Sequence, residues 1–179
     1  MLVSCGLTRA VLPDGREFIF RPSFERIAEL GHPHEIVELF AELHNDATAA
    51  SAARYVLLTL CDTDAYELTG YVSEPGKPVA GLMPDAEAVI LARHLMTHGI
   101  CGRPSGNAGQ FSPEFNASEY IASAVVHFGM TATEAGQLSM TQFQDLFAQN
   151  FPEQVKAKPP SRNEYDEFMK QIRANKGAK

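Results

Sequence analysis

The spacing of apolar residues predicts a hairpin at the start of the chain. Phe18 and Phe20 fall on one face of an extended segment, at a period of two, with Glu17 and Ile19 on the other face. The tripeptide PDG at 13–15 precedes this segment and has the composition of a tight turn. Because an isolated hairpin is only marginally stable in water, we expect this one to pack against helices.

After the hairpin, apolar positions recur at the spacing of a helix. The run HPHEIVELFAELH carries an apolar stripe on one face, and Pro33 suits its first turn. Residue types that begin and end helices predict further ones at 23–31, from Asp46 or Thr48 to Cys61, at 64–70, and from Asp85 to His98 with a stop at Gly99. Capping-box pairs predict four more, near 117–128, 132–137, 140–149 and 162–174: Asn116 with Glu119, Thr131 with Glu134, Ser139 with Gln142, and Ser161 with Glu164.

Proline and glycine mark the connections between these elements. The stretch YVSEPGKPVAGLMP at 71–84 predicts a surface loop and a candidate hinge, and residues 101–115 predict a second long loop. Three prolines at 152, 159 and 160 separate the last predicted helix from the rest. We therefore expect a mainly α, multi-helix domain with a small N-terminal antiparallel β-hairpin at 1–152, followed by a basic helical arm at 153–179.

Charge is distributed unevenly between these two parts. The formal net charge is −7, and the arm holds seven basic against four acidic residues, so it carries +3 and leaves −10 on residues 1–152. An acidic body repels phosphate backbones, which disfavours nucleic-acid binding before Glu153. No apolar run approaches the roughly 20 residues that span a bilayer. The first residues do not have the pattern of a secretory signal, and three unevenly spaced cysteines fit a reducing cytosol. We expect a soluble intracellular protein.

The segment ARHLMTHGICG at 92–102 contains a candidate metal site. His94 and His98 are four residues apart and so share a helix face, and Cys101 follows just beyond. Zinc binds both imidazole nitrogen and thiolate, which makes these three residues candidate ligands in a metal-dependent enzyme. Against this, Leu95 stands where the HExxH signature has its glutamate general base, and no fourth ligand is near in sequence. We favour the alternative, a helix C-terminus in which His98 complements the dipole, and expect no cofactor.

The segment TATEAGQLSMTQFQDLF at 131–147 has a helix-turn-helix pattern. Its second helix would expose Thr141, Gln142 and Gln144, and the two glutamines are candidates for reading DNA bases. That helix carries no cation, however, and its apolar set indicates packing: Met140, Phe143, Leu146, Phe147 and Phe151. We therefore favour two small helices folded against each other over a DNA-binding unit.

Three segments give the chain a family resemblance. They are FRPSFERIAELGHPHEIVELFAELH (Phe20–His44) after the hairpin, AEAVILARHLMTHGICG (Ala86–Gly102), and EYIASAVVHFGMTATEAGQLSMTQFQDLF (Glu119–Phe147). Together they resemble the tail assembly chaperones of long-tailed bacteriophages and their prophage relatives. A short helix followed by a Met-Thr or Leu-Thr start and an amphipathic helix with Phe and Leu is a recurrent ending in such proteins.

The resemblance implies a non-enzymatic protein in the cytoplasm of the bacterial host. Such a protein would coat the tape-measure protein, recruit tail-tube subunits and lack catalytic residues. Homo-oligomer formation is a further expectation, because the basic arm could dock on the acidic body of a neighbouring copy. The candidate protein-binding residues are Phe143, Leu146, Phe147 and Phe151, with Arg162, Lys170 and Arg173 of the arm. A metal-dependent enzyme and a prophage DNA-binding regulator remain the alternatives.

Overall fold

A computed structural model describes residues 5–74, 77–103 and 112–152 of the chain. The chain divides into two compact units, Met1–Leu146 and Phe147–Lys179. The predicted arm at 153–179, with its helix at 162–174, lies outside the described residues. Among the described residues, no helix is both long and apolar enough to cross a membrane.

The N-terminal hairpin is confirmed. Strands β1 (Thr8–Val11) and β2 (Glu17–Phe20) pair in antiparallel fashion, with Thr8 opposite Phe20 and Val11 opposite Glu17. Phe18 and Phe20 are both buried, as the period-two pattern predicts. The strand β2 is also joined to a distant segment, because Arg21 N–H donates to the Leu60 carbonyl and Asp62 N–H donates to the Ile19 carbonyl, both at 2.9 Å.

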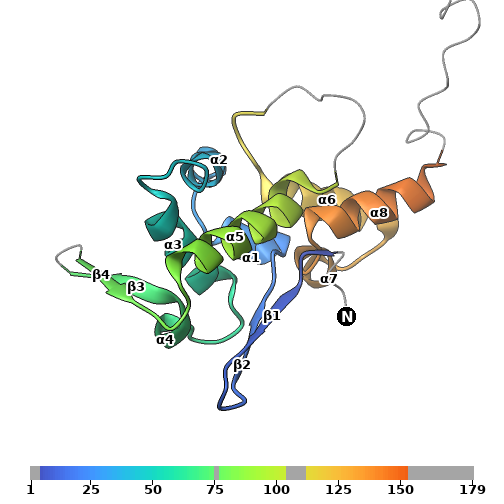
Figure 1. Cartoon of the computed structure of the whole chain (residues 1–179). Helices are drawn as coiled ribbons and strands as arrows, with labels where there is room; N and C mark the ends of the chain where they lie inside the picture. The colour runs from blue at the N-terminus through green and yellow to red at the C-terminus, as the bar shows by residue number, and fades with distance from the viewer. Residues whose placement is uncertain (1–4, 75–76, 104–111, 153–179) are drawn as a thin grey trace, which may run out of the picture. The chain divides into compact units, whose positions relative to one another are not determined.

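The rest of the first unit is mainly helical, as predicted. In chain order the α-helices are α1 (Phe24–Ala28), α2 (Pro33–Glu42), α3 (Ala49–Leu60), α4 (Tyr66–Thr69), α5 (Asp85–Met96), α6 (Ala117–Phe128), α7 (Ala132–Gly136) and α8 (Met140–Asn150) (Figure 1). The capping-box predictions at α7 and α8 are confirmed by reciprocal side-chain contacts. At α6 Asn116 caps the helix as predicted, but Glu119 accepts from the Asn116 side chain and not from its backbone N–H, so the box is not reciprocal. The clearest is the reciprocal pair at α7, where the Glu134 carboxylate accepts from Thr131 N–H at 2.9 Å and Glu134 N–H donates to Thr131 Oγ1 at 3.2 Å.

The loop predicted at 71–84 is wrong for half of its length. Strands β3 (Gly70–Ser73) and β4 (Lys77–Ala80) pair in antiparallel fashion there. The base of this second hairpin is held to α4, since Leu82 N–H donates to the Glu67 carbonyl and Met83 N–H to the Leu68 carbonyl. Each strand has only four residues, so the Pro and Gly residues around them dominate the composition of the segment and hide its extended pattern.

The helix stop predicted at Gly99 is also wrong. After α5 the chain continues into a π-helical turn, η2 (Thr97–Cys101), in which Gly102 N–H donates to the Thr97 carbonyl at 2.8 Å. Gly99 is buried, and a Cβ there would lie 2.8 Å from Ile27 Cδ1 and 3.2 Å from Pro22 Cβ. Gly99 therefore allows close packing against α1. Its position near a predicted helix end does not reveal this role.

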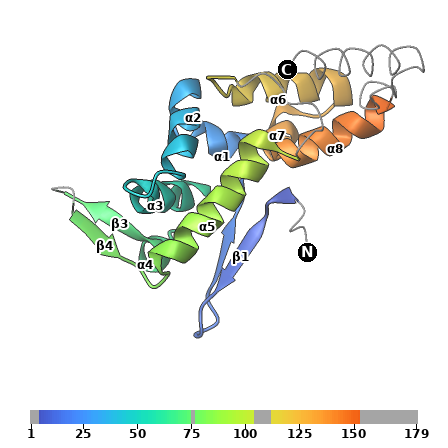
Figure 2. The ribbon, with the colours of Figure 1, turned by 45° about the horizontal axis from the view of Figure 1, so that its top comes forward.

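Two parts of the core hold the first unit together. The helices α3 and α5 cross and bury Ala53, Val56 and Leu57 of α3 with Ala92 and Leu95 of α5 (Figure 2). Phe24 of α1 packs in a cluster with four further aromatic rings, which come from the segment before α6, from α6 and from α8: Phe115, Tyr120, Phe128 and Phe143. Aromatic pairs at these separations add to the area that they bury.

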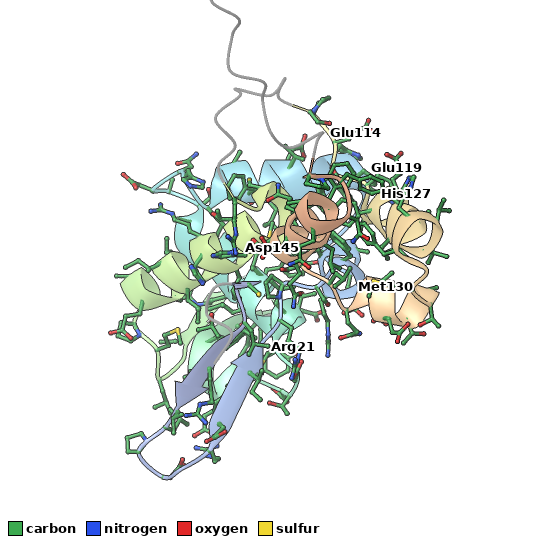
Figure 3. The ribbon with its side chains drawn as sticks, turned by 90° about the vertical axis from the view of Figure 1, so that its right-hand side faces the viewer. Arg21, Glu114, Glu119, His127, Met130 and Asp145 are labelled. Carbon is green, nitrogen blue, oxygen red and sulfur yellow. The ribbon has the colours of Figure 1, made fainter. Side chains whose placement is uncertain are left out.

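The side of α6 that faces solvent carries both polar and apolar side chains, because Val125 and Val126 are exposed there beside His127. Glu114 precedes this helix, Glu119 and His127 lie on it, and Met130 follows its end (Figure 3). Of the second unit, residues 147–152 are described. There Phe151 N–H donates to the Phe147 carbonyl at 2.8 Å, and the two rings lie 4.9 Å apart.

Candidate functional site

The three candidate zinc ligands lie at the junction of α5 and η2. The rings of His94 and His98 approach edge to face, with 4.6 Å between centroids, and Cys101 is exposed. The Nδ1 atom of His98 lies 2.8 Å from Thr141 Oγ1 of α8, at hydrogen-bond distance. Thr141 itself is fully buried. In the part of the chain that the structure describes, no three His, Cys, Asp or Glu side chains are placed to hold a metal ion.

Burial shifts the pKa of two of these three residues. Burial lowers the pKa of His98, and the nearby His94 and Arg103 lower it further. Partial desolvation raises the pKa of the Cys101 thiol. The geometry thus assigns His98 a packing role, as the polar link between η2 and α8.

The residues proposed to read DNA are engaged within the protein. Gln142 Oε1 accepts from Ser139 N–H at 2.9 Å as part of the capping box of α8. Gln144 Oε1 accepts from Arg103 N–H at 2.7 Å, and its Nε2 donates to the Cys101 carbonyl at 3.2 Å. The expected exposure of Thr141 is wrong, because its side chain faces the core. Neither glutamine is poised to read a base edge in this arrangement.

The apolar candidates on α8 have different surroundings. Phe143 is 8% exposed and belongs to the aromatic part of the core, and Leu146 packs partly buried against that core. Phe147 and Phe151 contact each other in the second unit. The basic candidates Arg162, Lys170 and Arg173 lie outside the described residues.

A site that the sequence does not reveal lies between α3, α4 and β3. It is a groove of about 570 Å³ whose lining is mainly apolar, and we call it the tyrosine groove. Helix α3 contributes Ser51, Arg54, Tyr55 and Leu58, α4 contributes Tyr66, and β3 contributes Tyr71 and Val72. Three of the five tyrosines of the protein therefore gather here from separate elements. The only sequence signal for such a site is the presence of five tyrosines in a chain without tryptophan, and it does not indicate which of them lie together.

The aromatic side chains of the groove are exposed but ordered by contacts. Tyr55 is 47% exposed, and its hydroxyl donates to the Leu30 carbonyl at 3.0 Å. Tyr66 and Tyr71 are 53% and 38% exposed, and their rings meet edge to face at 5.5 Å. Rigid, amphipathic tyrosines of this kind are typical of surfaces that bind other proteins, because they bury a large area at low entropic cost.

Arg54, a cation that lines the groove, is ion-paired. Arg54 is only 6% exposed, and its Nη2 donates to the Asp85 carboxylate at the start of α5. Its buried Nε has no hydrogen-bond partner in the described part of the chain. Arg54 consequently joins α3 to α5 and presents little positive charge to a ligand.

Carboxylates flank the groove on two sides. On the α2 flank, a depression that shares Tyr55 with the groove contains Glu35, Glu38 and Glu42. On the α4 flank, a depression that shares Leu58 and Tyr66 contains Asp62 and Asp64. The site therefore combines an aromatic centre with acidic margins.

Fold and groove together define a small, mainly helical protein with a solvent-exposed aromatic groove. The chain matches a family of unknown function, DUF6246, over residues 20–54 and 47–167, which is most of its length. It belongs to that family. No curated protein and no solved structure matches the chain.

Proposed function

We propose that this protein works by binding other proteins, without catalysis, as a tail assembly chaperone-like factor of a long-tailed phage or prophage. Its place of action would be the cytoplasm of the bacterial host, and its partners the tape-measure protein or the tail-tube subunits. The observation that supports a binding role best is the tyrosine groove. The assignment to tail assembly rests on the resemblance of the three segments quoted above.

The physical case begins with exposed aromatic area. Three half-exposed tyrosines with Val72, which is 50% exposed, leave a mainly apolar surface in contact with water. Exposed apolar patches that are surrounded by polar residues are typical of protein interaction sites. Since the polar groups framing this groove are mostly carboxylates, the surface suits a polypeptide better than a nucleic acid.

A direct test is co-expression with the tape-measure and tail-tube proteins encoded in the same genome. We expect more soluble tape-measure protein in the presence of this chain, and co-elution of the two in size-exclusion chromatography. The double variant Tyr66→Ser/Tyr71→Ser should lower the co-eluting fraction at least about fivefold, because truncation of central aromatic residues costs 1 kcal/mol or more each at interfaces.

The matched control is Val126→Ser, which removes an apolar side chain that is 75% exposed on α6, away from the groove. It should leave the co-eluting fraction unchanged. Failure of the unaltered protein to co-elute with either phage protein, at concentrations in the tens of micromolar, would contradict the proposal.

A further inference from the structure

The walls of the tyrosine groove include an open strand edge. Successive side chains of a strand point to opposite faces of its sheet, yet the neighbours Tyr71 and Val72 both line the groove. A groove that runs along the edge of β3 is lined by both neighbours. That edge is the one away from β4, since the two strands form a sheet of their own.

The hydrogen-bond register shows which backbone groups face this edge. Gly70 N–H donates to the Tyr66 carbonyl as the cap of α4, so it is not used for pairing with Ala80 opposite. Two residues further on, Val72 lies opposite Pro78, which has no N–H. Since bonded and non-bonded pairs alternate along an antiparallel ladder, Val72 directs its own N–H and C=O away from β4. No backbone partner for them occurs among the described residues.

Charge on the two flanks selects the kind of segment that would pair there. Within the described chain, Glu38, Glu42 and Asp64 form no ion pair. Three cations beside the groove are already matched with carboxylates: Arg54 with Asp85, Arg26 with Glu29, and Arg16 with Glu67. Beside Glu42, Arg93 donates from Nε to the Leu43 carbonyl at 2.8 Å. The aromatic rings between the flanks add a favourable surface for ammonium and guanidinium groups.

We propose that the outer edge of β3 binds an extended, lysine- or arginine-bearing segment of a partner protein, which adds as a third strand over the tyrosine groove. The partner's backbone pairs with Val72 N–H and C=O, its apolar side chains cover Tyr55, Tyr66 and Leu58, and its cations reach the glutamates of α2. This is strand addition, in which the backbone supplies affinity and the pockets supply specificity. The inference rests on the proposed function, because it names the chemistry of the bound partner.

The test uses the full-length chain and a fluorescein-labelled peptide of four Lys-Val repeats, followed by fluorescence anisotropy. The charge-inverted peptide of four Glu-Val repeats is the ligand control and should bind at least about tenfold more weakly, because repulsion by carboxylates replaces attraction. Binding of the Lys-Val peptide should also weaken as salt rises. Equal binding of the two peptides would overturn the assignment of a cationic partner.

Substitution of Val72 separates strand addition from mere contact. Val72→Pro removes the outward N–H but breaks no hydrogen bond between β3 and β4. It should weaken peptide binding about tenfold, which corresponds to the loss of one hydrogen bond of about 1.4 kcal/mol. Val72→Thr keeps both the N–H and the branched Cβ, and should bind as the unaltered protein does. Unchanged binding in Val72→Pro, with a circular dichroism spectrum like that of Val72→Thr, would overturn strand addition.

Substitution on the flank tests the charge argument by itself. Glu42→Lys should weaken binding of the Lys-Val peptide about fivefold, the scale expected for reversal of one exposed charge next to a bound cation. Glu114→Lys makes the same change of net charge beside α6, on the face shown in Figure 3, and should leave binding unchanged. If both variants weaken binding equally, the flank has no specific role and the inference fails.

The outcomes distinguish this inference from the proposed function. Co-elution with a tape-measure or tail-tube protein that survives Val72→Pro and Glu42→Lys would leave the function standing and remove the strand-addition site. Peptide binding that follows the expected pattern, without co-elution of either phage protein, would support the site and contradict the tail-assembly role. Tighter binding of a peptide made from residues 161–179 of this chain would overturn the assignment to a partner protein in favour of a second copy.

Discussion

A single hydrogen bond shows how much the tertiary structure alters the chemistry of one residue. His98 lies in a segment that, by spacing, offers three metal ligands, yet its Nδ1 atom faces the fully buried hydroxyl of Thr141 at 2.8 Å. Burial, with His94 and Arg103 nearby, lowers the pKa of His98 and so favours the neutral imidazole. The residue is therefore a structural link between η2 and α8.

That link predicts a pH dependence of stability. The pKa of His98 is lower in the folded than in the unfolded chain, so the folded state binds fewer protons below pH 6.5. The free energy of unfolding therefore falls as the pH drops from 6.5 to the folded-state pKa. The variant His98→Asn, which can keep a hydrogen bond to Thr141, should show a flatter dependence between pH 7 and 5. Urea unfolding at a series of pH values measures this, with His34→Asn on α2 as the exposed control. Parallel curves for His98→Asn and the unaltered protein would contradict the assignment.

At the scale of elements, the junction of η2 with the N-terminal segment depends on close approach. Gly6 has φ +85°, and a Cβ there would lie 2.4 Å from His98 Cβ and 2.9 Å from Pro22 Cγ. Pro22 and Ile27 also contact Gly99 of η2. Three segments thus meet at Gly6 and Gly99: the chain before β1, the region of Pro22 and α1, and the π-helical turn. Neither position has room for a Cβ atom.

Gly6→Ala should accordingly destabilise the protein by about 3 kcal/mol, which combines about 1 kcal/mol for the left-handed backbone with roughly 2 kcal/mol for overpacking. Gly15→Ala is the matched control. Its φ is +88°, but a Cβ there would have no neighbour within 4 Å. This control should lose only the backbone contribution of about 1 kcal/mol. Chemical denaturation of both variants measures the difference, and equal losses would contradict close packing at Gly6.

Sequence patterns predicted elements better than they predicted sites. The helices at α3, α6, α7 and α8 begin where capping residues such as Thr131 indicate, because a cap and its helix are neighbours in sequence. The hairpin β3–β4 was missed because four-residue strands rich in Pro and Gly carry too little periodicity. The tyrosine groove was missed because Tyr55, Tyr66 and Tyr71 come from three elements, and no local pattern states that those elements meet.

At the scale of the whole molecule, charge separates residues 1–152 from the C-terminal segment. The first part carries −10 and the last 27 residues carry +3. If the basic segment pairs with the acidic body of a neighbouring copy, removal of residues 153–179 should reduce the oligomer to a smaller species. Sedimentation velocity at 50 mM and 500 mM salt compares the two forms, because charge pairing weakens with ionic strength. An unchanged sedimentation coefficient on truncation would remove this role of the segment.

The sequence by itself determined the mainly helical class, the N-terminal hairpin, the capped starts of α6, α7 and α8, and the charge asymmetry. Each of these depends on residues close together in the chain, where spacing alone decides which side chains share a face or a cap. Only the tertiary structure decided that Thr141 is buried, that Gln142 and Gln144 bond internally, and that a strand edge borders three tyrosines. Most of these features depend on contacts between segments that are distant in sequence. The packing of the helices decides which of their surfaces are buried and which remain exposed to water, and no local sequence pattern specifies that packing.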